Sequence, residues 1–522
     1  MRKCIYIYMI FLLLQGVEMK LDYLKDIGVD AISLSPIYDG TSVDSDLNVV
    51  NHTTIDNKFG TEDDIKNLIA AAHKKGIYVV LDFIPNQTSK KHAWFVESNK
   101  ANPGDKKNYY VWKAGSSLPN NWLTTNGSEA WTNSKDRSAY YLHQLSPDLP
   151  DLNLYSRIVV GELNKILHYW MSLGVDGFNI RHSGFMLEDS DLRNDVQLNS
   201  NKPNPYDNME HTNSFGLASN IILLKLWHHI IEDNQGQNGR SFMTGMDSWD
   251  RSIPTYRDKL GDTNFPHLSF CTVINVDVNC NGSCMKNFVE ENLKNTTIGK
   301  SPTWMLGSDM ISRFSTRMGN YTKRNEVLTM IALLLPGSTV LYSGDELMMT
   351  DIGQANESPV SISQPWRTPM KWDNSTSSYG FSNATCSSVS SKDAMQVTEA
   401  LTNAKSMLNF IKKLNKLRNA DAFRLSSAAD IRYGPDCSST FSFVRGFDGV
   451  DCYLVIANLG STDSCSDFSS VSGGDKAQAT VKLVTPSAES GHEEGAEVDT
   501  TNVKVKPNEG VVLSWKCGLY FK

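Results

Sequence analysis

The chain lacks an excess of positive charge. Its 50 Lys and Arg residues are outnumbered by 58 Asp and Glu residues, which leaves a formal net charge of −8 at pH 7. It also lacks runs rich in lysine or arginine, and it contains no internal repeat. Because nucleic acids and anionic membrane surfaces attract basic proteins, this composition argues against both as partners.

A hydrophobic run long enough to cross a bilayer is also missing. The N-terminal apolar run, Cys4 to Leu14, is about half of the ~20 residues that a membrane helix needs. Because Arg2 and Lys3 precede it, we favour a signal-like or truncated-anchor segment over residues 1–15, although no small-x-small cleavage pattern follows. A buried strand is the alternative, since the run is rich in β-branched and aromatic residues.

Cysteine is absent between Cys4 and Cys271, and eight cysteines lie in the C-terminal half. Cys280 and Cys284 have no histidine nearby, which favours a short disulfide loop over a zinc site. We expect no metal and no cofactor. Asn-x-Ser/Thr sequons accompany these cysteines, and the candidate glycosylation sites among them are Asn126, Asn281, Asn295, Asn320, Asn356, Asn374 and Asn383. Two further sequons begin at Asn51 and Asn86. Together these features indicate the secretory pathway, with the protein secreted or on the extracellular side of the plasma membrane.

At 522 residues, the chain is too long for a single core. Apolar segments that alternate with helical ones predict parallel strands within residues 29–38, 77–85, 175–183, 241–248, 268–275, 303–308 and 338–347. The pattern predicts an α/β fold: a (β/α)₈ barrel whose first strand is missing or replaced. The barrel starts over residues 16–85 and continues over 152–424, with an insertion at 86–151 and an antiparallel β-domain at 425–522.

Four segments carry a specific resemblance: DFIPNQTSKKHAWF (82–95), GVDGFNIRHSGFMLED (174–189), WMLGSDMISRFSTRMGN (304–320) and RTPMKWDNS (367–375). They are similar to successive motifs of the α-amylase superfamily, glycoside hydrolase family 13, in its α-glucosidase (maltase) branch. The resemblance implies an amylase (TIM-type) barrel with an inserted domain B and a C-terminal β-domain. It also implies a site at the carboxyl ends of the barrel strands.

A retaining glycosidase needs one carboxylate as nucleophile and a second carboxyl group as acid/base, about 5 Å apart. The resemblance places the nucleophile at Arg181, the acid/base at Gly245 and a third carboxylate at Met310. It therefore implies that no catalytic residue remains. The vestigial pocket would comprise Asp82, Gln87, Asn179, Arg181, Asp247, Ser308 and Asp309. The family residues that bind a terminal glucose correspond to residues 46–48 of this chain.

Two interpretations of the remaining carboxylates stay open. Asp247 lies two residues beyond Gly245 and, if the strand continues, would point to the same side, so it could act as a displaced acid. Arg181 cannot replace the nucleophile, because a guanidinium is permanently charged. The alternative, which we favour, is an ion-pair cluster of Arg181, Asp247 and Asp309 that fills the former pocket.

The segments 184–198, 304–320, 369–382 and 498–516 look especially like the heavy subunits of heteromeric amino-acid transporters, the rBAT-like branch of the superfamily. This resemblance implies a non-catalytic ectodomain that acts as chaperone and docking partner for a membrane-embedded amino-acid transporter light subunit. The alternatives are an active α-glucosidase and a secreted relative of maltases that retains residual sugar binding.

Overall fold

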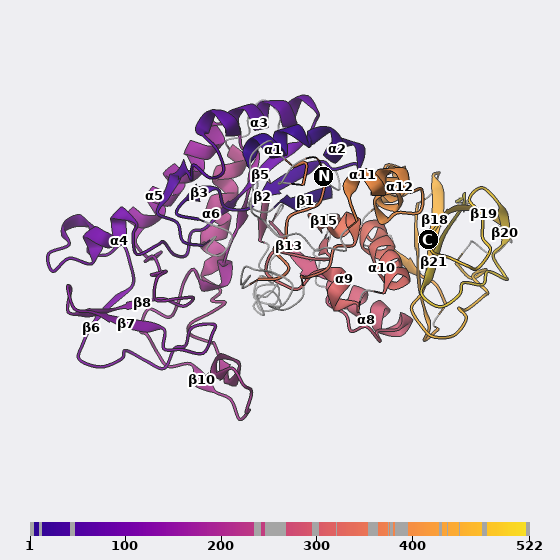
Figure 1. Ribbon diagram of the computed structural model, residues 1–522. Coiled ribbons are helices and arrows are strands. Elements are labelled where there is room, and N and C mark those ends of the chain that lie inside the picture. Colours follow the sequence, from indigo (N-terminus) through magenta and orange to yellow (C-terminus); the bar gives the residue numbers. More distant parts are fainter. Residues whose placement is uncertain are drawn as a thin grey trace.

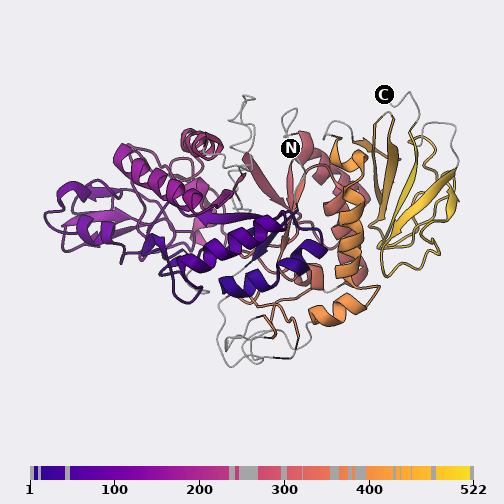
Figure 2. The same cartoon turned by 90° about the horizontal axis from the view of Figure 1, so that it is seen from above.

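Eight parallel strands close into a barrel in the order β1-β15-β14-β13-β12-β9-β5-β2 (Figures 1 and 2). They are β1 (Ile5–Met9), β2 (Ala31–Leu34), β5 (Tyr78–Phe83), β9 (Gly177–Ile180), β12 (Phe242–Gly245), β13 (Leu268–Val273), β14 (Thr303–Met305) and β15 (Ser338–Tyr342). The strands are nearly continuous in apolar residues because helices cover their outer side. The predicted amylase-type α/β barrel with a C-terminal antiparallel sheet is confirmed.

This computed structural model describes residues 5–9, 13–41, 47–233, 242–245, 268–294, 302–319, 321–352, 364–373, 375, 379–381, 395–426, 431–435, 437–447, 449–471 and 478–517. None of the helices formed by these residues is long and apolar enough to cross a membrane.

The first strand of the barrel is present, which corrects the preferred interpretation of residues 1–15. Within that segment, β1 pairs in parallel with β2 on one side and with β15 on the other. Tyr6, for example, lies opposite both Ala31 and Val340. A barrel of seven strands would leave two edges unpaired, and β1 supplies the hydrogen-bonding groups for both edges. The strand alternative therefore describes Ile5–Met9, whose β-branched and aromatic residues suit a strand.

Helices alternate with the barrel strands along the chain, as the sequence pattern predicted. They are α1 (Leu14–Met19), α2 (Leu21–Asp26), α3 (Glu62–Lys74), α5 (Arg157–Ser172), α6 (Asn220–Asp233), α8 (Gly282–Lys294), α9 (Phe314–Arg317), α10 (Thr322–Leu334), α11 (Val397–Thr402), α12 (Met407–Arg418) and α13 (Asp421–Arg424). At the start of α3, Thr61 and Asp64 form a capping box, which satisfies two backbone N–H groups of the first turn.

Small sheets extend from the loops at the carboxyl ends of the barrel strands. The insertion contains α4 (Ala93–Ser98) and a three-stranded sheet of β6 (Trp112–Ala114), β8 (Ala139–Leu142) and β7 (Trp131–Ser134). β3 (Tyr38–Asp39) pairs with β4 (Asn51–Ile55), and β10 (Val196–Gln197) pairs with β11 (Met209–Glu210). In Figure 1 the insertion and the C-terminal sheet lie on opposite sides of the barrel.

The C-terminal sheet has the order β16-β17-β18-β21-β19-β20. Its strands are β16 (Arg432–Tyr433), β17 (Thr440–Arg445), β18 (Asp451–Asn458), β19 (Gln478–Val484), β20 (Glu497–Asp499) and β21 (Glu509–Lys516). Disulfides join Cys437 to Cys465 and Cys452 to Cys517 in this domain. The predicted short loop between Cys280 and Cys284 is confirmed as a third disulfide.

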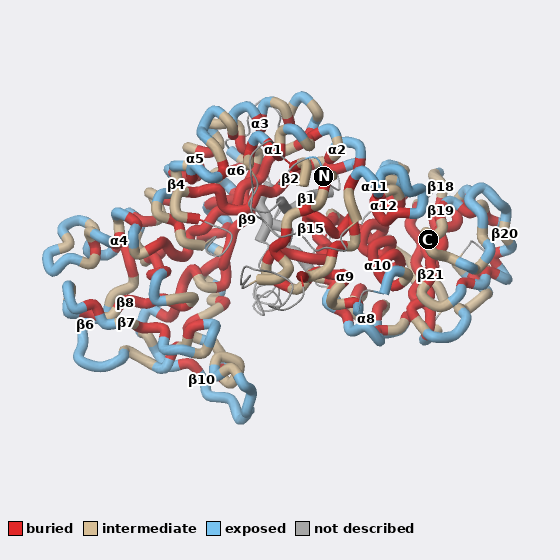
Figure 3. Tube along the Cα trace, in the orientation of Figure 1, coloured by how far each residue is buried: buried red, intermediate tan, exposed pale blue. Residues whose placement is uncertain are grey.

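Helix α10 connects the barrel to the C-terminal sheet. Beyond its first two residues, which face solvent at least in part, every residue from Arg324 to Leu334 is buried (Figure 3). Arg324 donates from Nη1 to the carbonyl oxygen of Leu459 at 2.8 Å and from Nη2 to the carbonyl oxygen of Cys280. The second half of α10, from Val327 to Leu334, is apolar apart from Thr329, whereas the buried polar residues of its first half include Arg324 and Glu326, which hydrogen-bond to neighbouring segments. The two domains therefore share one continuous core.

Gly282 lies at the same junction, and we expect replacement by a larger residue to destabilise the protein. A Cβ atom at this position would lie 2.2–2.5 Å from backbone atoms of Thr440, so the backbone would have to shift. We expect Gly282→Ala to lower the free energy of unfolding by about 1–3 kcal/mol, the usual cost of overpacking. Gly161→Ala is the matched control, because that added Cβ meets no atom within 4 Å on α5. It should stabilise by up to ~1 kcal/mol. Urea unfolding of both variants tests this, and equal effects would contradict it.

Candidate functional site

The site begins with two neighbouring strand ends. Asp82 lies near the end of β5 and is directly opposite Asn179 of β9 in the sheet register. The Asn179 Nδ2 group donates to Asp82 Oδ1 at 2.6 Å, and both side chains are fully buried. The backbone N–H of Arg181 donates to the carbonyl oxygen of Phe83 at 2.8 Å, which extends the pairing by one step beyond β9. This extension holds the Arg181 backbone beside the end of β5.

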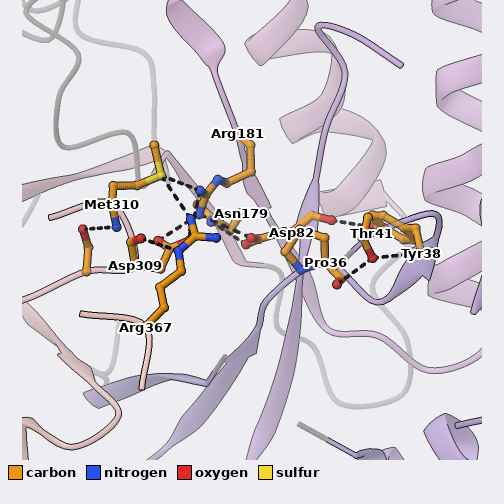
Figure 4. Close-up of polar contacts among 10 residues, drawn as sticks. Pro36, Tyr38, Thr41, Asp82, Asn179, Arg181, Asp309, Met310 and Arg367 are labelled. Carbon is orange, nitrogen blue, oxygen red and sulfur yellow. Dashed lines mark hydrogen bonds and ion pairs between the residues drawn. The ribbon is translucent and has the colours of Figure 1, made fainter. Parts of the chain in front are cut away.

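Arg181 forms ion pairs with two aspartates (Figure 4). Its Nη1 lies 3.4 Å from Asp82 Oδ2 and 3.3 Å from Asp309 Oδ1, and its Nη2 lies 3.2 Å from Asp309 Oδ2. The pair with Asp309 is therefore bidentate, the arrangement in which guanidinium and carboxylate match best. The Sδ atom of Met310 lies 3.1 Å from Nη2. Arg181 and both aspartates have at most 1% of their side-chain surface exposed.

Asp309 has a second cationic partner, Arg367. Arg367 Nη2 lies 3.4 Å from Asp309 Oδ2, and its Nε donates to the Asp309 carbonyl oxygen at 2.8 Å. Burial opposes ionisation of Asp309, but the charges of Arg181 and Arg367 outweigh it and hold the pKa of this carboxyl below its usual value. Two arginines and two aspartates thus form a buried quartet whose formal charges cancel. We call Asp82, Arg181, Asp309 and Arg367 the buried quartet.

The quartet has the chemistry of a structural cluster. Both of its carboxylates accept from a guanidinium, and a guanidinium can neither attack an anomeric carbon nor exchange a proton near neutral pH. A positive charge at such a centre would also oppose an oxocarbenium-like transition state. Asp82, Arg181 and Asp309, which the sequence predicted for a vestigial pocket, are instead buried and paired with one another.

Among the other predicted positions, the structure describes Ser308, Gly245 and Gln87. Ser308 accepts through Oγ from the Met310 N–H at 3.1 Å, and Gly245 lies in β12 opposite Phe270. Gln87 is fully buried, and neither polar atom of its side-chain amide hydrogen-bonds to another residue that the structure describes. Asp247 lies outside the described residues, as does Asp46. Of the predicted ion-pair cluster, Arg181 and Asp309 are paired, whereas the place of Asp247 stays a prediction.

Neither Arg367 nor the ion pair of Asp82 with Arg181 was predicted from the sequence. Arg367 is the first residue of the RTPMKWDNS motif, but nothing in that motif connects it to a residue 58 positions earlier. Charge balance was the available signal. A buried arginine beside two aspartates leaves one negative charge uncompensated, which calls for a second cation.

A second pair of buried carboxyl groups lies beside the insertion. Asp151 accepts from Asn86 Nδ2 at 3.2 Å and from the Gln144 N–H at 3.1 Å. Burial raises the pKa of Asp151 to about 7. Burial and then the neighbouring Asp151 charge raise the pKa of Glu188 to about 8. Within the described part of the chain, no group of three or more acidic, histidine or cysteine side chains is arranged to hold a metal ion.

A surface pocket of about 290 Å³ lies away from the quartet, at the insertion. Its walls include Leu118, Trp122, Trp131, Gln197 and Met209, so it lies between the insertion and the β10–β11 hairpin. Trp122 and Trp131 are at most 3% exposed and stack on each other. They are therefore core residues of the insertion and offer no exposed face to a sugar ring.

Two of the seven candidate glycosylation sites lie among the described residues. Asn126 is exposed, and Asn281 is half-buried at the start of α8. The sequons at Asn295, Asn320, Asn356, Asn374 and Asn383 begin outside the described residues.

The chain is similar to a known protein family and to characterised relatives. Residues 13–426 match the family described as alpha amylase, catalytic domain. The chain is 29% identical over 516 residues to an alpha-glucosidase of Culex pipiens, with 96% of this chain and 86% of that protein covered. It is 28% identical over 521 residues to the human amino acid transporter heavy chain SLC3A1, with 96% of this chain and 74% of that protein covered.

Among solved structures, the alpha-glucosyl transfer enzyme XgtA has a TM-score of 0.83 with 23% identity, over 99% of both chains. At that identity the likeness shows the fold alone. The curated relatives include both enzymes and transporter heavy chains at nearly the same identity. Overall sequence identity therefore does not distinguish an enzyme from a transporter heavy chain. The side chains of the site must be considered instead.

Arg181 should be essential for stability. Arg181→Met would leave Asp82 and Asp309 buried with only Arg367 to compensate them, and breaking a buried ion pair in this way costs about 3–5 kcal/mol. Arg181→Lys should recover part of this loss, since it keeps the charge without the bidentate geometry. Arg193→Met is the control, because Arg193 is 68% exposed in its pair with Asp189. That change should cost at most ~1 kcal/mol. Chemical unfolding measures all three, and equal losses in Arg181→Met and Arg193→Met would refute the quartet's role.

The carboxyl pair predicts a pH dependence of stability. The folded-state pKa values of Asp151 and Glu188, about 7 and 8, lie above the ~4 expected in an unfolded chain. The folded chain therefore binds protons more tightly, and this stabilisation is complete below pH ~4 and is lost as pH rises to ~8. We expect Glu188→Gln to flatten this decline, whereas Glu129→Gln at an exposed position should not. Thermal melts between these pH values test it, and identical slopes in both variants would contradict it.

Proposed function

This chain belongs to the alpha-amylase family, and we propose that it is a non-catalytic member whose former active site is now a structural ion-pair cluster. One observation carries the proposal. At the position where the family resemblance places the nucleophile, Arg181 is buried between Asp82 and Asp309. A glycosidase needs a carboxylate there, and both carboxylates of the quartet are already paired with guanidinium groups.

The remaining family positions support the same conclusion. Gly245 carries no side chain at the position of the acid/base, and Met310 replaces the third carboxylate. Removal of a single catalytic group typically lowers kcat by orders of magnitude, and removal of the others adds little further loss. A displaced acid at Asp247 would restore one role and leave the nucleophile missing.

We further propose that the chain acts as a heavy subunit, a chaperone and docking partner for a membrane-embedded amino-acid transporter light subunit. The similarity to transporter heavy chains covers 96% of this chain and supports this role. Three disulfides and the sequons support folding in the secretory pathway, with the protein on the extracellular side of the plasma membrane or secreted. The alternatives are an α-glucosidase and a secreted sugar-binding relative.

The first arm of the test measures hydrolysis. Purified protein is assayed with maltose and p-nitrophenyl α-glucoside beside the Culex alpha-glucosidase. We expect turnover at background, at least ~10⁴-fold below that enzyme, because the nucleophile and acid/base are both missing. Clear turnover that is abolished by Asp247→Asn would overturn the proposal and identify Asp247 as a displaced acid.

The second arm tests the partner. The chain is co-expressed with transporter light subunits, and co-purification and amino-acid uptake at the cell surface are measured. The matched control replaces the chain with the Culex alpha-glucosidase, which shares the family but not the proposed role. We expect capture and increased uptake only with the chain studied here. Maltose binding without capture of any light subunit would favour the sugar-binding alternative.

A further inference from the structure

The sequons in the described part of the chain differ in how their asparagine side chains are held. Those at Asn51, Asn86, Asn126 and Asn281 can be compared directly. N-glycosylation needs an amide nitrogen that can carry a bulky, solvated sugar. Burial and hydrogen bonding of the side chain therefore separate usable sequons from unusable ones.

Asn86 is unsuited to carry a glycan. Its side chain is 1% exposed, and Nδ2 donates to Asp151 Oδ1 at 3.2 Å. The hydroxyl group of Thr88, the third residue of the sequon, is also buried and lies 2.6 Å from the Tyr110 hydroxyl. A sugar on Asn86 would disrupt this contact between insertion and barrel and would place polar groups in the core without partners.

Asn51 has the opposite environment. It is exposed at the start of β4, and its Oδ1 accepts from both the N–H and the hydroxyl group of Thr53 at 3.0 Å. Nδ2 makes no hydrogen bond to the described residues, so the nitrogen that would bear the sugar is available. Asn126 is similar, because it is exposed and its Oδ1 accepts from the Ser128 N–H at 3.2 Å.

The sequon at Asn281 is intermediate. Asn281 is half-buried and accepts through Oδ1 from the N–H of Cys284, inside the loop that the Cys280–Cys284 disulfide closes. Its neighbour Gly282 packs against the backbone of Thr440. Asn281 thus lies at the junction of barrel and C-terminal domain, where space is restricted, and it does not enter the proposal.

We propose that Asn51, together with Asn126, is an N-glycan attachment site, and that Asn86 stays unmodified in the folded protein. The Nδ2 atom loses one proton and bonds to the anomeric carbon of a lipid-linked oligosaccharide, and the bond from that carbon to the lipid pyrophosphate breaks. The inference rests on the proposed secretory route. It also bears on docking, since glycans at Asn51 and Asn126 would exclude the β4 edge and the loop beside the insertion pocket from any partner interface.

Tryptic peptides separate the three sites. Residues 26–58 contain Asn51, residues 76–90 contain Asn86 and residues 114–135 contain Asn126. The full-length protein from a eukaryotic secretory host is treated with a peptide N-glycosidase in ¹⁸O-water, which converts each glycosylated asparagine to ¹⁸O-labelled aspartate. We expect the label at Asn51 and Asn126 and none at Asn86.

Variants check the assignment. Thr53→Ala should remove the glycan at Asn51, whereas Thr53→Ser, which keeps the hydroxyl group, should retain it. Asn86→Gln should leave the number of glycans unchanged and lower the melting temperature. Label at Asn86, or an unlabelled Asn51 beside other labelled sequons, would overturn this inference and leave the secretory route intact. Absence of label at every sequon would overturn both.

Discussion

The bidentate pairing of Arg181 with Asp309 is the interaction on which the buried quartet depends. Charges buried this deeply are stable only when each has a partner of good geometry. Because Asp82 and Arg367 complete the set, four separate parts of the chain converge on one electrically neutral cluster. An aspartate at position 181 would place three carboxylates against Arg367 alone. An Arg181→Asp substitution alone would therefore destabilise the fold.

This constraint explains why overall similarity is a poor guide here. An alpha-glucosidase and a transporter heavy chain are about equally similar to the chain, at 29% and 28% identity. Fold and activity depend on different side chains, and a small number of positions at the ends of strands decides the chemistry. In this chain, the buried quartet places two arginines and two aspartates at such positions, where they pair with one another.

Much of the fold could be predicted because local patterns agree with it. The apolar runs around Val79 and Leu341, and the capping box at Thr61, are local signals that tertiary structure did not override. β1 was harder, since a basic start followed by a short apolar run is typical of both a signal segment and a strand. Its barrel role depends on pairing with Val340, more than three hundred residues away. The pairing of Arg367 with Asp309 and the charge interaction of Glu188 with Asp151 likewise join residues that are distant in the sequence.

The packing of helix α10 shows that the folding unit extends beyond the residues that match the family. The match to the amylase catalytic domain ends at residue 426, before the C-terminal sheet begins. Yet Met330 of α10 lies against Gly510 of β21, and Arg445 of β17 donates to the carbonyl oxygen of Leu334 at 3.2 Å. A fragment cut at the family boundary would leave one side of an apolar helix open to water. A fragment that is to fold stably must therefore include the C-terminal sheet, which lies outside the matched residues.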